Sequence, residues 1–335
     1  MELHTPWLLV NIVIFIFGFW TLIKGSDLFV DASSDLARCW HMSELAIGLT
    51  FVSIGTSLPE LASSLYAAFC NQPDFIIGNI AGSITTNITL ILGIGIVICG
   101  NLTFPRALLT RDAVLMNLVF IVTIVMTCIS RAAMPNGAET YGLDRWCGAL
   151  LLIGAVVYCV YLFYAKEEET EESRQLRKEV KHGIPFLLFL TLFSLCMITL
   201  GSKLLVDNVV WMAEEIGVSQ MLISATIVAF GTSVPELAVT IVGVRKCKHD
   251  LALGNIIGSC IFNVLLIFGF CAVIRPLAVI GWPGIVNMGM MFGSGVLLFV
   301  FMLHGKERLR RGTGIALVAF YLLFLLYNGR ELFLK

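Results

Sequence analysis

Long apolar segments, separated by short polar links, make up most of the chain. A run of about 20 apolar residues is long enough to cross a bilayer as a helix. This pattern predicts an all-α polytopic membrane protein with ten transmembrane helices. The ten segments lie at 7–37, 43–69, 73–99, 107–130, 143–165, 184–213, 219–244, 249–273, 281–304 and 312–331.

One long hydrophilic segment interrupts this pattern, at 166–182, and it reads KEEETEESRQLRKEVKH. Its mixed charges are typical of a solvated linker. It separates two groups of five predicted helices. We therefore expect a first five-helix repeat at 1–165, the linker, and a second five-helix repeat at 183–335.

The first predicted helix is too long to stand perpendicular to the membrane. Its charged residues Lys24, Asp27, Asp31 and Asp35 are spaced by three or four, so they form one stripe on a helix. Part of the stripe recurs in the sixth predicted helix. Two interpretations remain open: a tilted helix whose charged end leaves the bilayer, or a mobile helix pair that opens a central site from alternate sides.

Composition agrees with a membrane protein and excludes other classes. Hydrophobic residues make up 58% of the chain and charged residues 13%, whereas soluble domains carry about 25% charged residues. The net charge of −1 gives no basis for a nucleic-acid partner. The N-terminus lacks a basic start and a small-residue cleavage site, so we expect no cleaved signal peptide. The ten cysteines contain no CxxC pair and are expected to be free thiols.

The distribution of Lys and Arg predicts the orientation. With the N-terminus outside, fifteen of the 22 Lys and Arg residues fall on the inner side and five on the outer side. Inner loops of membrane proteins carry this excess. We expect a multi-pass protein of the cell (inner) membrane, with both termini outside and the linker in the cytoplasm.

The two groups of helices share repeated motifs, which indicates a duplication. Because five is an odd number of spans, the second copy enters the membrane from the opposite face, which defines an inverted-topology repeat with a site near the midplane. Three motif pairs share one offset of 176 residues: GTSLPELA at 55–62 with GTSVPELA at 231–238, GSDLFVD at 25–31 with GSKLLVD at 201–207, and GNIAGSITTNI at 78–88 with GNIIGSCIFNV at 254–264.

The first motif pair places a carboxylate in each apolar repeat, at Glu60 and Glu236. Acidic residues at membrane depth usually face a cavity and mark an ion or substrate path. The preceding Pro59 and Pro235 cannot donate to the carbonyl four residues earlier, so each helix should break there. Freed carbonyls at this depth need a partner, and a cation is one.

Neutral oxygen donors surround these carboxylates in the sequence. All are hard donors, which suit Ca²⁺ or Na⁺ and disfavour zinc or copper. The charge of two carboxylates can be balanced by one divalent cation, by monovalent ions or by protons. The side-chain amides could instead form hydrogen bonds between helices. The candidate donors are Ser53, Thr56, Ser57, Ser83, Asn87, Ala229 (through its backbone), Thr232, Ser233, Ser259 and Asn263.

The pair GTSLPE and GTSVPE, each followed by GNxxGS with Asn four residues after the Ser, resembles the two α-repeats of the sodium/calcium exchanger family in the calcium/cation antiporter superfamily. The resemblance implies four cation positions that hold three Na⁺ or one Ca²⁺ in turn. It implies a Ca²⁺ site of Glu60, Glu236 and the carbonyls of Thr56 and Thr232. It implies Na⁺ sites of Ser53, Thr56, Ser83 and Glu236 on one side and Ala229, Thr232, Ser259 and Glu60 on the other, with Asn87 and Asn263 in the middle plane and Ser57 and Ser233 as secondary donors.

Departures from the family pattern refine this expectation. Many members have Asp where this chain has Asn87 and Asn263, and potassium-dependent members typically use Asp there, so K⁺ cotransport is disfavoured. The usual GSN reads GSI at Ile84 and GSC at Cys260. The GNxxEH-type motif of calcium/proton exchangers is absent. The linker is too short for the calcium-sensing domains of animal members, so the resemblance is to the compact prokaryotic type.

The expected function is therefore secondary active antiport, in which the entry of three Na⁺ drives the export of one Ca²⁺ by alternating access. The expected partners are Ca²⁺, Na⁺ and the lipid bilayer, with no enzymatic activity, no cofactor and a monomeric state. Three alternatives stay open: a Ca²⁺/H⁺ or other cation/H⁺ antiporter, a passive cation channel, and an intramembrane hydrolase that uses Ser57 or Ser233.

Overall fold

The computed structural model describes residues 8–133, 139–164, 180, 182–215, 229–279 and 281–333. Within these ranges, eight helices are long and apolar enough to cross a membrane, and a bent helix pair, Glu44–Thr56 with Leu58–Phe69, makes a ninth. The all-helical fold is therefore confirmed. The predicted span at 219–244 lies partly outside the described residues.

The helices of the first half follow the predicted segments closely. Three short π-helical stretches, marked η, interrupt them. The elements are α1 (Leu8–Trp40), α2 (Glu44–Ile47), η1 (Gly48–Val52), α3 (Ser53–Thr56), α4 (Leu58–Phe69), α5 (Pro73–Thr86), η2 (Asn87–Ile91), α6 (Leu92–Cys99), η3 (Leu108–Ala113), α7 (Val114–Ile129) and α8 (Arg145–Tyr164).

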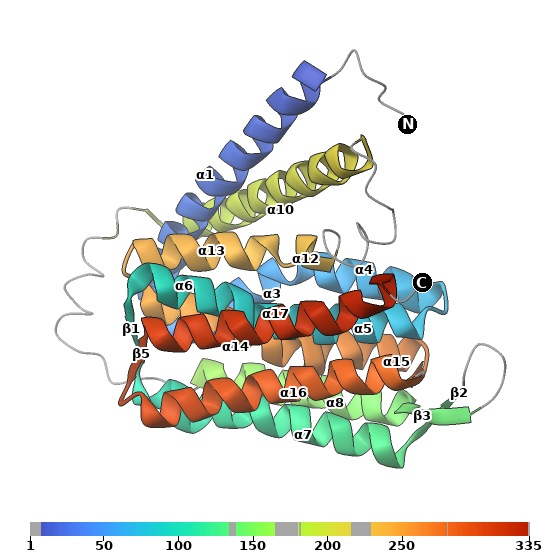
Figure 1. Ribbon diagram of the computed structural model, residues 1–335. Helices are drawn as coiled ribbons and strands as arrows, with labels where there is room; N and C mark the ends of the chain where they lie inside the picture. The colour runs from blue at the N-terminus through green and yellow to red at the C-terminus, as the bar shows by residue number, and fades with distance from the viewer. Residues whose placement is uncertain are drawn as a thin grey trace.

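The second half repeats much of this order, and short strands close both ends of the bundle (Figure 1). Strand β1 (Asn101–Thr103) pairs antiparallel with β5 (Arg308–Arg310) at one end, and β3 (Glu139–Leu143) pairs with β2 (Arg131–Ala133) and β4 (Leu277–Ala278) at the other. The helices are α10 (Ile184–Glu215), α12 (Ala229–Gly231), α13 (Val234–Arg245), α14 (His249–Phe262), η5 (Asn263–Phe268), α15 (Gly269–Ile274), α16 (Gly281–His304) and α17 (Arg311–Phe333).

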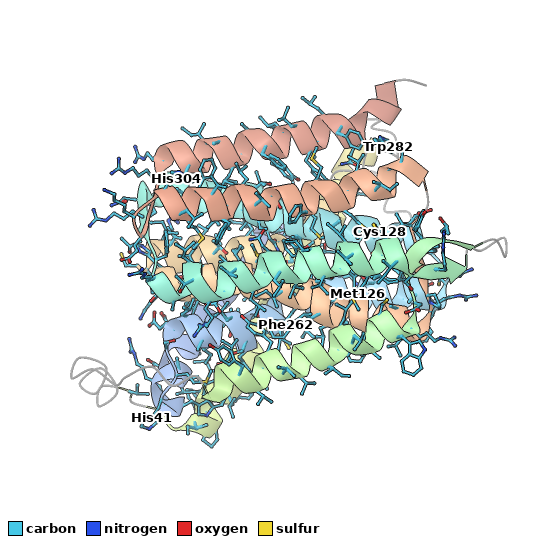
Figure 2. The ribbon with its side chains drawn as sticks, turned by 90° about the horizontal axis from the view of Figure 1, so that it is seen from below. His41, Met126, Cys128, Phe262, Trp282 and His304 are labelled. Carbon is cyan, nitrogen blue, oxygen red and sulfur yellow. The ribbon has the colours of Figure 1, made fainter. Side chains whose placement is uncertain are left out.

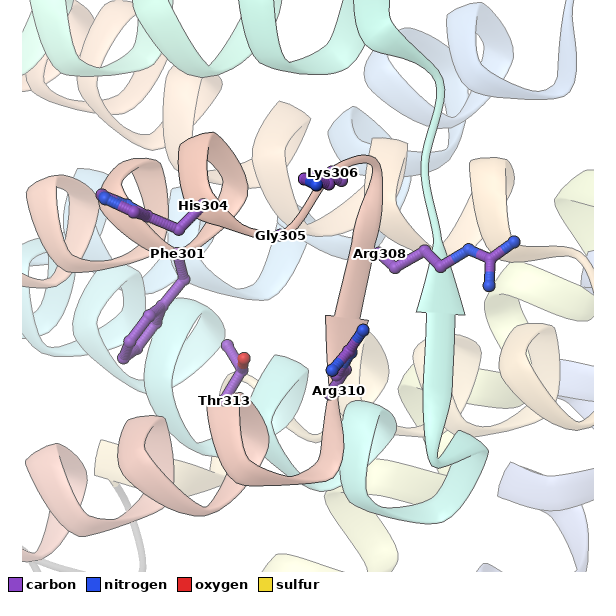
Figure 3. Close-up of a pocket in the computed structure, with 7 residues that line it drawn as sticks. All are labelled: Phe301, His304, Gly305, Lys306, Arg308, Arg310 and Thr313. Atoms are coloured by element: carbon purple, nitrogen blue, oxygen red, sulfur yellow. The ribbon is translucent and has the colours of Figure 1, made fainter.

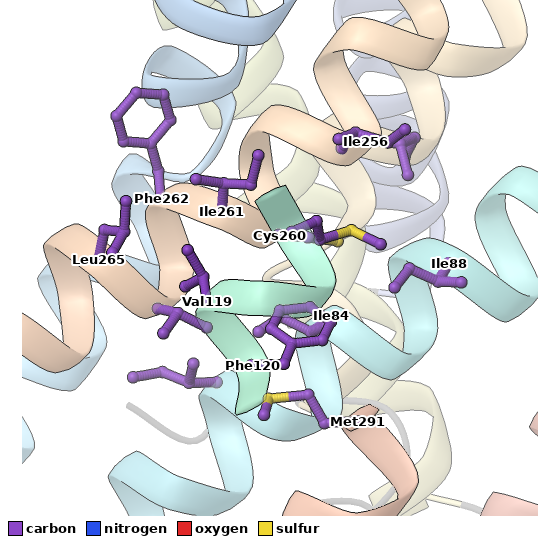
Figure 4. Packing of buried hydrophobic residues seen from close by; sticks show 14 of the residues in the cluster. Ile84, Ile88, Val119, Phe120, Ile256, Cys260, Ile261, Phe262, Leu265 and Met291 are labelled. Carbon is purple, nitrogen blue, oxygen red and sulfur yellow. The ribbon is translucent and has the colours of Figure 1, made fainter. Parts of the chain in front are cut away.

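Two spans form the centre of the molecule. The most apolar window of His249–Ile274 is 83% buried and that of Pro73–Cys99 is 67% buried, against 22–44% for the other long spans. Ile84 and Cys260, which replace the Asn of the usual GSN motif, lie buried in the apolar cluster of these spans (Figure 4). These positions therefore serve packing.

Helices around this centre present apolar side chains outward. Trp146 on α8 is 80% exposed, and Trp282 on α16 is 64% exposed. Figure 2 shows Trp282 and His304 at opposite ends of α16, with apolar side chains along the helix between them. Such a surface suits contact with lipid.

Helices α1 and α10 form a separate layer against the rest of the bundle (Figure 1). A Cβ placed on Gly18 would lie 2.9 Å from Leu204 Cβ, and one on Gly201 would lie 2.6 Å from Leu22 N, so the two backbones nearly touch. With parts of α13 and the second span, they enclose an apolar cluster of their own. The layer therefore packs on the bundle through a cluster separate from the central one.

The charged stripe of α1 is bound to α13 at one end. Lys246, at the C-terminus of α13, donates from Nζ to Asp31 Oδ2 at 2.8 Å and to the backbone oxygen of Asp27 at 2.9 Å. Asp35 binds Arg38 one turn further along α1, at 3.0 Å. These contacts thus bind the layer of α1 and α10 to the bundle at one end.

Candidate cation site

Glu60 and Glu236 occupy equivalent positions, each in the first turn of a helix that begins at a break. The second span bends by 47° between Thr56 and Leu58, and α12 ends at Gly231 before α13 begins at Val234. The predicted breaks are therefore present at both prolines. Both glutamate side chains are 0% exposed. The free N–H groups of a helix start favour a negative charge there.

Each carboxylate accepts a hydrogen bond from a hydroxyl in the opposite half of the chain. Ser57 donates to Glu236 Oε1 at 3.0 Å. Ser233 donates to Glu60 Oε1 at 3.2 Å. Since Ser57 and Ser233 are themselves equivalent residues of the two repeats, the contacts are reciprocal. The two halves therefore build one site between them.

A second hydroxyl reaches each carboxylate from within its own half. Ser83 donates to Glu60 Oε1 at 3.3 Å. Ser259 donates to Glu236 Oε1 at 3.4 Å. The first and second sequence motifs thus meet at both carboxylates. Each Oε1 is held by one donor from each half.

Further contacts extend these groups into two hydrogen-bonded clusters, one around each carboxylate, and we call the two clusters together the ring. Ser83 Oγ lies 3.0 Å from Ser233 Oγ, and Asn263 Nδ2 donates to Ser83 Oγ at 3.3 Å. On the other side, Ser259 donates to the backbone oxygen of Ser53 at 3.4 Å. The ring contains eight of the twelve residues singled out from the sequence: Ser53, Ser57, Glu60, Ser83, Ser233, Glu236, Ser259 and Asn263.

Several oxygens of the site lack a hydrogen-bond partner among the described residues. They include Oε2 of both glutamates, Oδ1 of Asn87 and Asn263, and Oγ1 of Thr232. Leaving a buried polar atom unpaired costs about 1–3 kcal/mol, more for a charged group. A hard cation would satisfy these acceptors together. Neither nitrogen nor sulfur is needed, and the described residues contain no group of three or more His, Cys, Asp or Glu that could hold a metal ion.

Close packing of α14 brings the two motifs together. A Cβ on Gly258 would lie 2.6 Å from both Leu49 O and Ser53 Oγ, so only glycine allows this approach. The neighbouring Ser259 thereby reaches the carbonyl of Ser53. The equivalent of Ser53 in the second half is Ala229, which begins α12 and whose side chain lies outside the described residues.

Two asparagines that the sequence analysis did not assign belong to the surroundings of the site. Asn255 Oδ1 accepts from Thr56 Oγ1 at 3.0 Å and is fully buried. Asn79, its equivalent in the first half, donates to the hydroxyls of Ser63 and Ser64 at 3.2 and 3.0 Å. The sequence contained a signal for them, because each is the Asn of the Gly-Asn pair that the two halves share. Thr56 is thus fixed beside the ring by a residue from the other half.

Asn87 and Asn263 each begin a π-helical stretch, η2 and η5. A π turn contains one more residue than an α turn, and it occurs frequently at functional sites. Both side chains are 0% exposed. Asn263 joins the ring, whereas neither polar atom of the Asn87 side chain has a partner in the described part of the chain. Two equivalent residues therefore differ in their contacts.

Comparison with known proteins places the whole chain in one family. The family model described as sodium/calcium exchanger protein matches residues 10–165 and 186–329. The chain is 30% identical to the sodium/calcium exchanger MaX1 of Methanosarcina acetivorans, over 94% of this chain and 97% of that protein. It is 34% identical to the putative antiporter CaxA of Alkalimonas amylolytica, over 95% and 99%.

A solved structure has the same fold. The sodium-calcium exchanger NCX_Mj, soaked with Na⁺ and Sr²⁺, superposes with a TM-score of 0.80 at 28% identity, over 95% of this chain and 98% of that one. This match, the family model and the relatives agree in describing a membrane antiporter of Ca²⁺ and another cation. The resemblance drawn from the two repeated motifs is therefore confirmed: the chain belongs to the sodium/calcium exchanger family.

Proposed function

We propose that the protein exchanges three Na⁺ for one Ca²⁺ across the membrane by alternating access. The observation that carries the proposal is the buried ring, in which each half of the chain supplies one carboxylate and hydroxyls to the other half's carboxylate. A structural bond between helices would leave no carboxylate oxygen unpaired. Here Oε2 of Glu60 and of Glu236 both lack a partner among the described residues.

Ca²⁺ is proposed to bind between the two carboxylates, with the carbonyls of Thr56 and Thr232 completing its coordination. The two negative charges of Glu60 and Glu236 match one divalent cation. The flanking Na⁺ sites use Ser53, Thr56, Ser83 and Glu236 on one side, and Ala229, Thr232, Ser259 and Glu60 on the other, with Asn87 and Asn263 between them. Because both kinds of site share the glutamates, Ca²⁺ and a full set of Na⁺ exclude each other, and this exclusion couples their transport.

The chain is proposed to form two inverted five-helix repeats, with the end that carries β1 and β5 in the cytoplasm. Basic residues support this orientation, since the inner side of a membrane protein carries the excess. The described loops at the β1–β5 end contain Arg106, Lys246, Lys248, Lys306 and Arg310, together with neighbouring arginines, whereas the other end contains Arg131, Arg145 and Arg275. Helices α1 and α10 are proposed to slide across the bundle and to expose the ring to each side in turn.

Proteoliposomes loaded with Na⁺ test this function directly. They should accumulate Ca²⁺ when diluted into Na⁺-free medium, and inside-positive or inside-negative potentials should alter the rate, because one net charge crosses in each cycle. Each such charge contributes about 2.3 kcal/mol per 100 mV. Uptake driven by a pH gradient alone, with none driven by Na⁺, would instead establish a Ca²⁺/H⁺ antiporter.

Replacing either carboxylate tests the site. Glu60→Gln and Glu236→Gln should each abolish exchange, because a neutral amide cannot balance the charge of Ca²⁺. Retention of full exchange by both variants would reject the assignment. Saturable counterflow separates antiport from a channel. A hydrolase is disfavoured by geometry, because the hydroxyls of Ser57 and Ser233 donate to glutamates and not to a histidine.

A further inference from the structure

A second polar site lies far from the ring. It is formed where α16 ends in a tight turn that leads into β5 and then into α17. A cavity of about 590 Å³ opens there, at the end of the bundle that carries β1 and β5 (Figure 3). It lies at the ends of two long spans, Trp282–His304 and Arg311–Asn328. Its lining residues are Phe301, His304, Gly305, Lys306, Arg308, Arg310 and Thr313.

The backbone around this cavity is held in an uncommon conformation. Lys306 and Glu307 both have positive φ, at 49° and 63°. Arg308 N donates to Gly305 O at 3.1 Å across the turn. A left-handed non-glycine residue costs about 1–3 kcal/mol and persists only where the surroundings impose it. The pairing of β5 with β1 supplies that constraint, and it fixes the turn that carries Lys306.

The cavity is strongly basic. Lys306, Arg308 and Arg310 line it, and none of them forms an ion pair with a carboxylate in the described part of the chain. Figure 3 shows Arg310 at the end of β5, next to the start of α17, whereas the side chain of Arg308 is directed from β5 toward β1. One acidic residue, Glu307, lies in the same turn. The cavity therefore attracts an anion.

Helix α17 adds to this positive potential. It begins at Arg311 and has no acidic residue in its first turn. The N-terminus of a helix is positively polarised, and an acidic residue or a bound anion normally balances it. Thr313 contributes a hydroxyl from this first turn to the lining of the cavity. The basic side chains and the polarity of the helix thus both favour an anionic ligand.

Apolar side chains next to the cavity indicate where this anion comes from. Val300 and Leu303, in the last turns of α16, are 40% and 52% exposed, and Ile315 of α17 is 62% exposed. On the outside of spanning helices these side chains face acyl chains. Basic pockets between transmembrane helices on the cytoplasmic side bind acidic lipid headgroups.

We propose that this cavity binds the phosphate headgroup of an anionic phospholipid of the adjoining leaflet. Lys306, Arg310 and Thr313 hold the phosphate, and the acyl chains lie along α16 and α17. The bound lipid joins the end of α16 to the β1–β5 pair and to the start of α17. The site is separate from the cation ring, so it does not depend on which ions the protein exchanges.

Lipid binding to the purified full-length protein tests this proposal. Native mass spectrometry would measure the affinity for phosphatidylglycerol and for phosphatidylcholine. One Lys or Arg near an acidic headgroup strengthens binding about fivefold, so removing two should weaken it about 30-fold. The wild type should prefer phosphatidylglycerol, and Lys306→Gln combined with Arg310→Gln should lose that preference.

A charge-matched variant separates the cavity from the general basic surface. Arg106 and Arg245 are exposed at the same end but do not line the cavity. Their double replacement by Gln should keep the preference within about twofold of the wild type. Lys306→Gln alone, in an exposed turn, should show an intermediate loss of about fivefold if the double variant proves unstable.

Two results would overturn the proposal. One is an equal loss in the cavity variant and in the matched variant, which would mean that lipid binds only to the diffuse basic surface. The other is complete displacement of phosphatidylglycerol by millimolar inorganic phosphate that itself binds to the wild type and not to the cavity variant. That result would identify the ligand as a soluble anion.

Discussion

A single methyl group at Gly258 is predicted to disrupt the cation ring. In the wild type, α14 lies so close to the second span that an added Cβ would be 2.6 Å from Leu49 O and 2.8 Å from Leu49 Cα. Both are backbone atoms and cannot rotate away. In Gly258→Ala the two helices must therefore separate.

The size of this separation follows from the contact. Ordinary van der Waals contact begins at 3.4 Å, so the Leu49 carbonyl must retreat by about 0.8 Å. The hydroxyl of the next residue, Ser259, lies 3.4 Å from both Glu236 Oε1 and Ser53 O, which share its single proton. These bonds are already long, and the movement breaks them. A typical hydrogen bond contributes about 0.5–1.5 kcal/mol, so losing these long ones should lower the affinity for Ca²⁺ about two- to tenfold.

Stability should change less than transport. Overpacking costs about 1–3 kcal/mol, while alanine in a helix recovers about 0.5–1 kcal/mol relative to glycine. Na⁺-driven Ca²⁺ uptake by proteoliposomes measures the transport effect, and thermal unfolding in detergent measures the stability. Gly289→Ala is the control, because no atom lies within 4 Å of its added Cβ. Unchanged Ca²⁺ affinity in Gly258→Ala would refute the idea that this glycine contact positions the ring.

Three further predictions follow from named contacts. Lys246→Gln removes the ion pair with Asp31 and should shift the equilibrium of α1 positions by about fivefold, since partly exposed pairs contribute up to about 1 kcal/mol. The amide hydrogens of α1 should then exchange faster in Lys246→Gln than in the control variant Arg245→Gln. Asn255→Ala should lower Ca²⁺ affinity in equilibrium binding without preventing folding, whereas an unchanged affinity would exclude Asn255 from the site. The backbone N–H at the start of α8 holds the pKa of the Asp144 carboxyl below its ordinary value, so Asp144→Ala should lower the Tm at neutral pH, by a difference that vanishes as the pH falls through that lowered pKa.

Much of the fold could be predicted from sequence because spans and breaks are local properties. The apolar runs predicted the long helices, and Pro59 and Pro235 predicted the breaks that the structure contains. The offset of 176 residues identified equivalent positions. An offset cannot say which equivalent residues touch. The reciprocal bonds from Ser57 and Ser233 could be found only once the two halves were placed together.

The missed features depend on packing between segments distant in sequence. A π turn has no local signal here, since nothing in the sequence at Asn87 or Asn263, where η2 and η5 begin, distinguishes a π turn from an α turn. The role of Asn255 depends on Thr56, which lies 199 positions earlier. The charged stripe of α1 was recognised, but its partner Lys246 belongs to the other half. Such pairings cannot be read from one segment.

The distribution of contacts favours a particular way of alternating access. Reciprocal bonds link the halves through Ser57–Glu236 and Ser233–Glu60, so separating the halves would remove a donor from each buried carboxylate at the same time. That loss is costly at membrane depth. Helices α1 and α10 instead pack against the bundle through a second apolar cluster, and among the described residues they contribute none of the hydrogen bonds of the ring. If this layer slides as proposed, the ring can stay assembled, and the polar contacts that break are those of Lys246 with α1 and the Arg38–Glu44 ion pair, near the surface, where water can replace them.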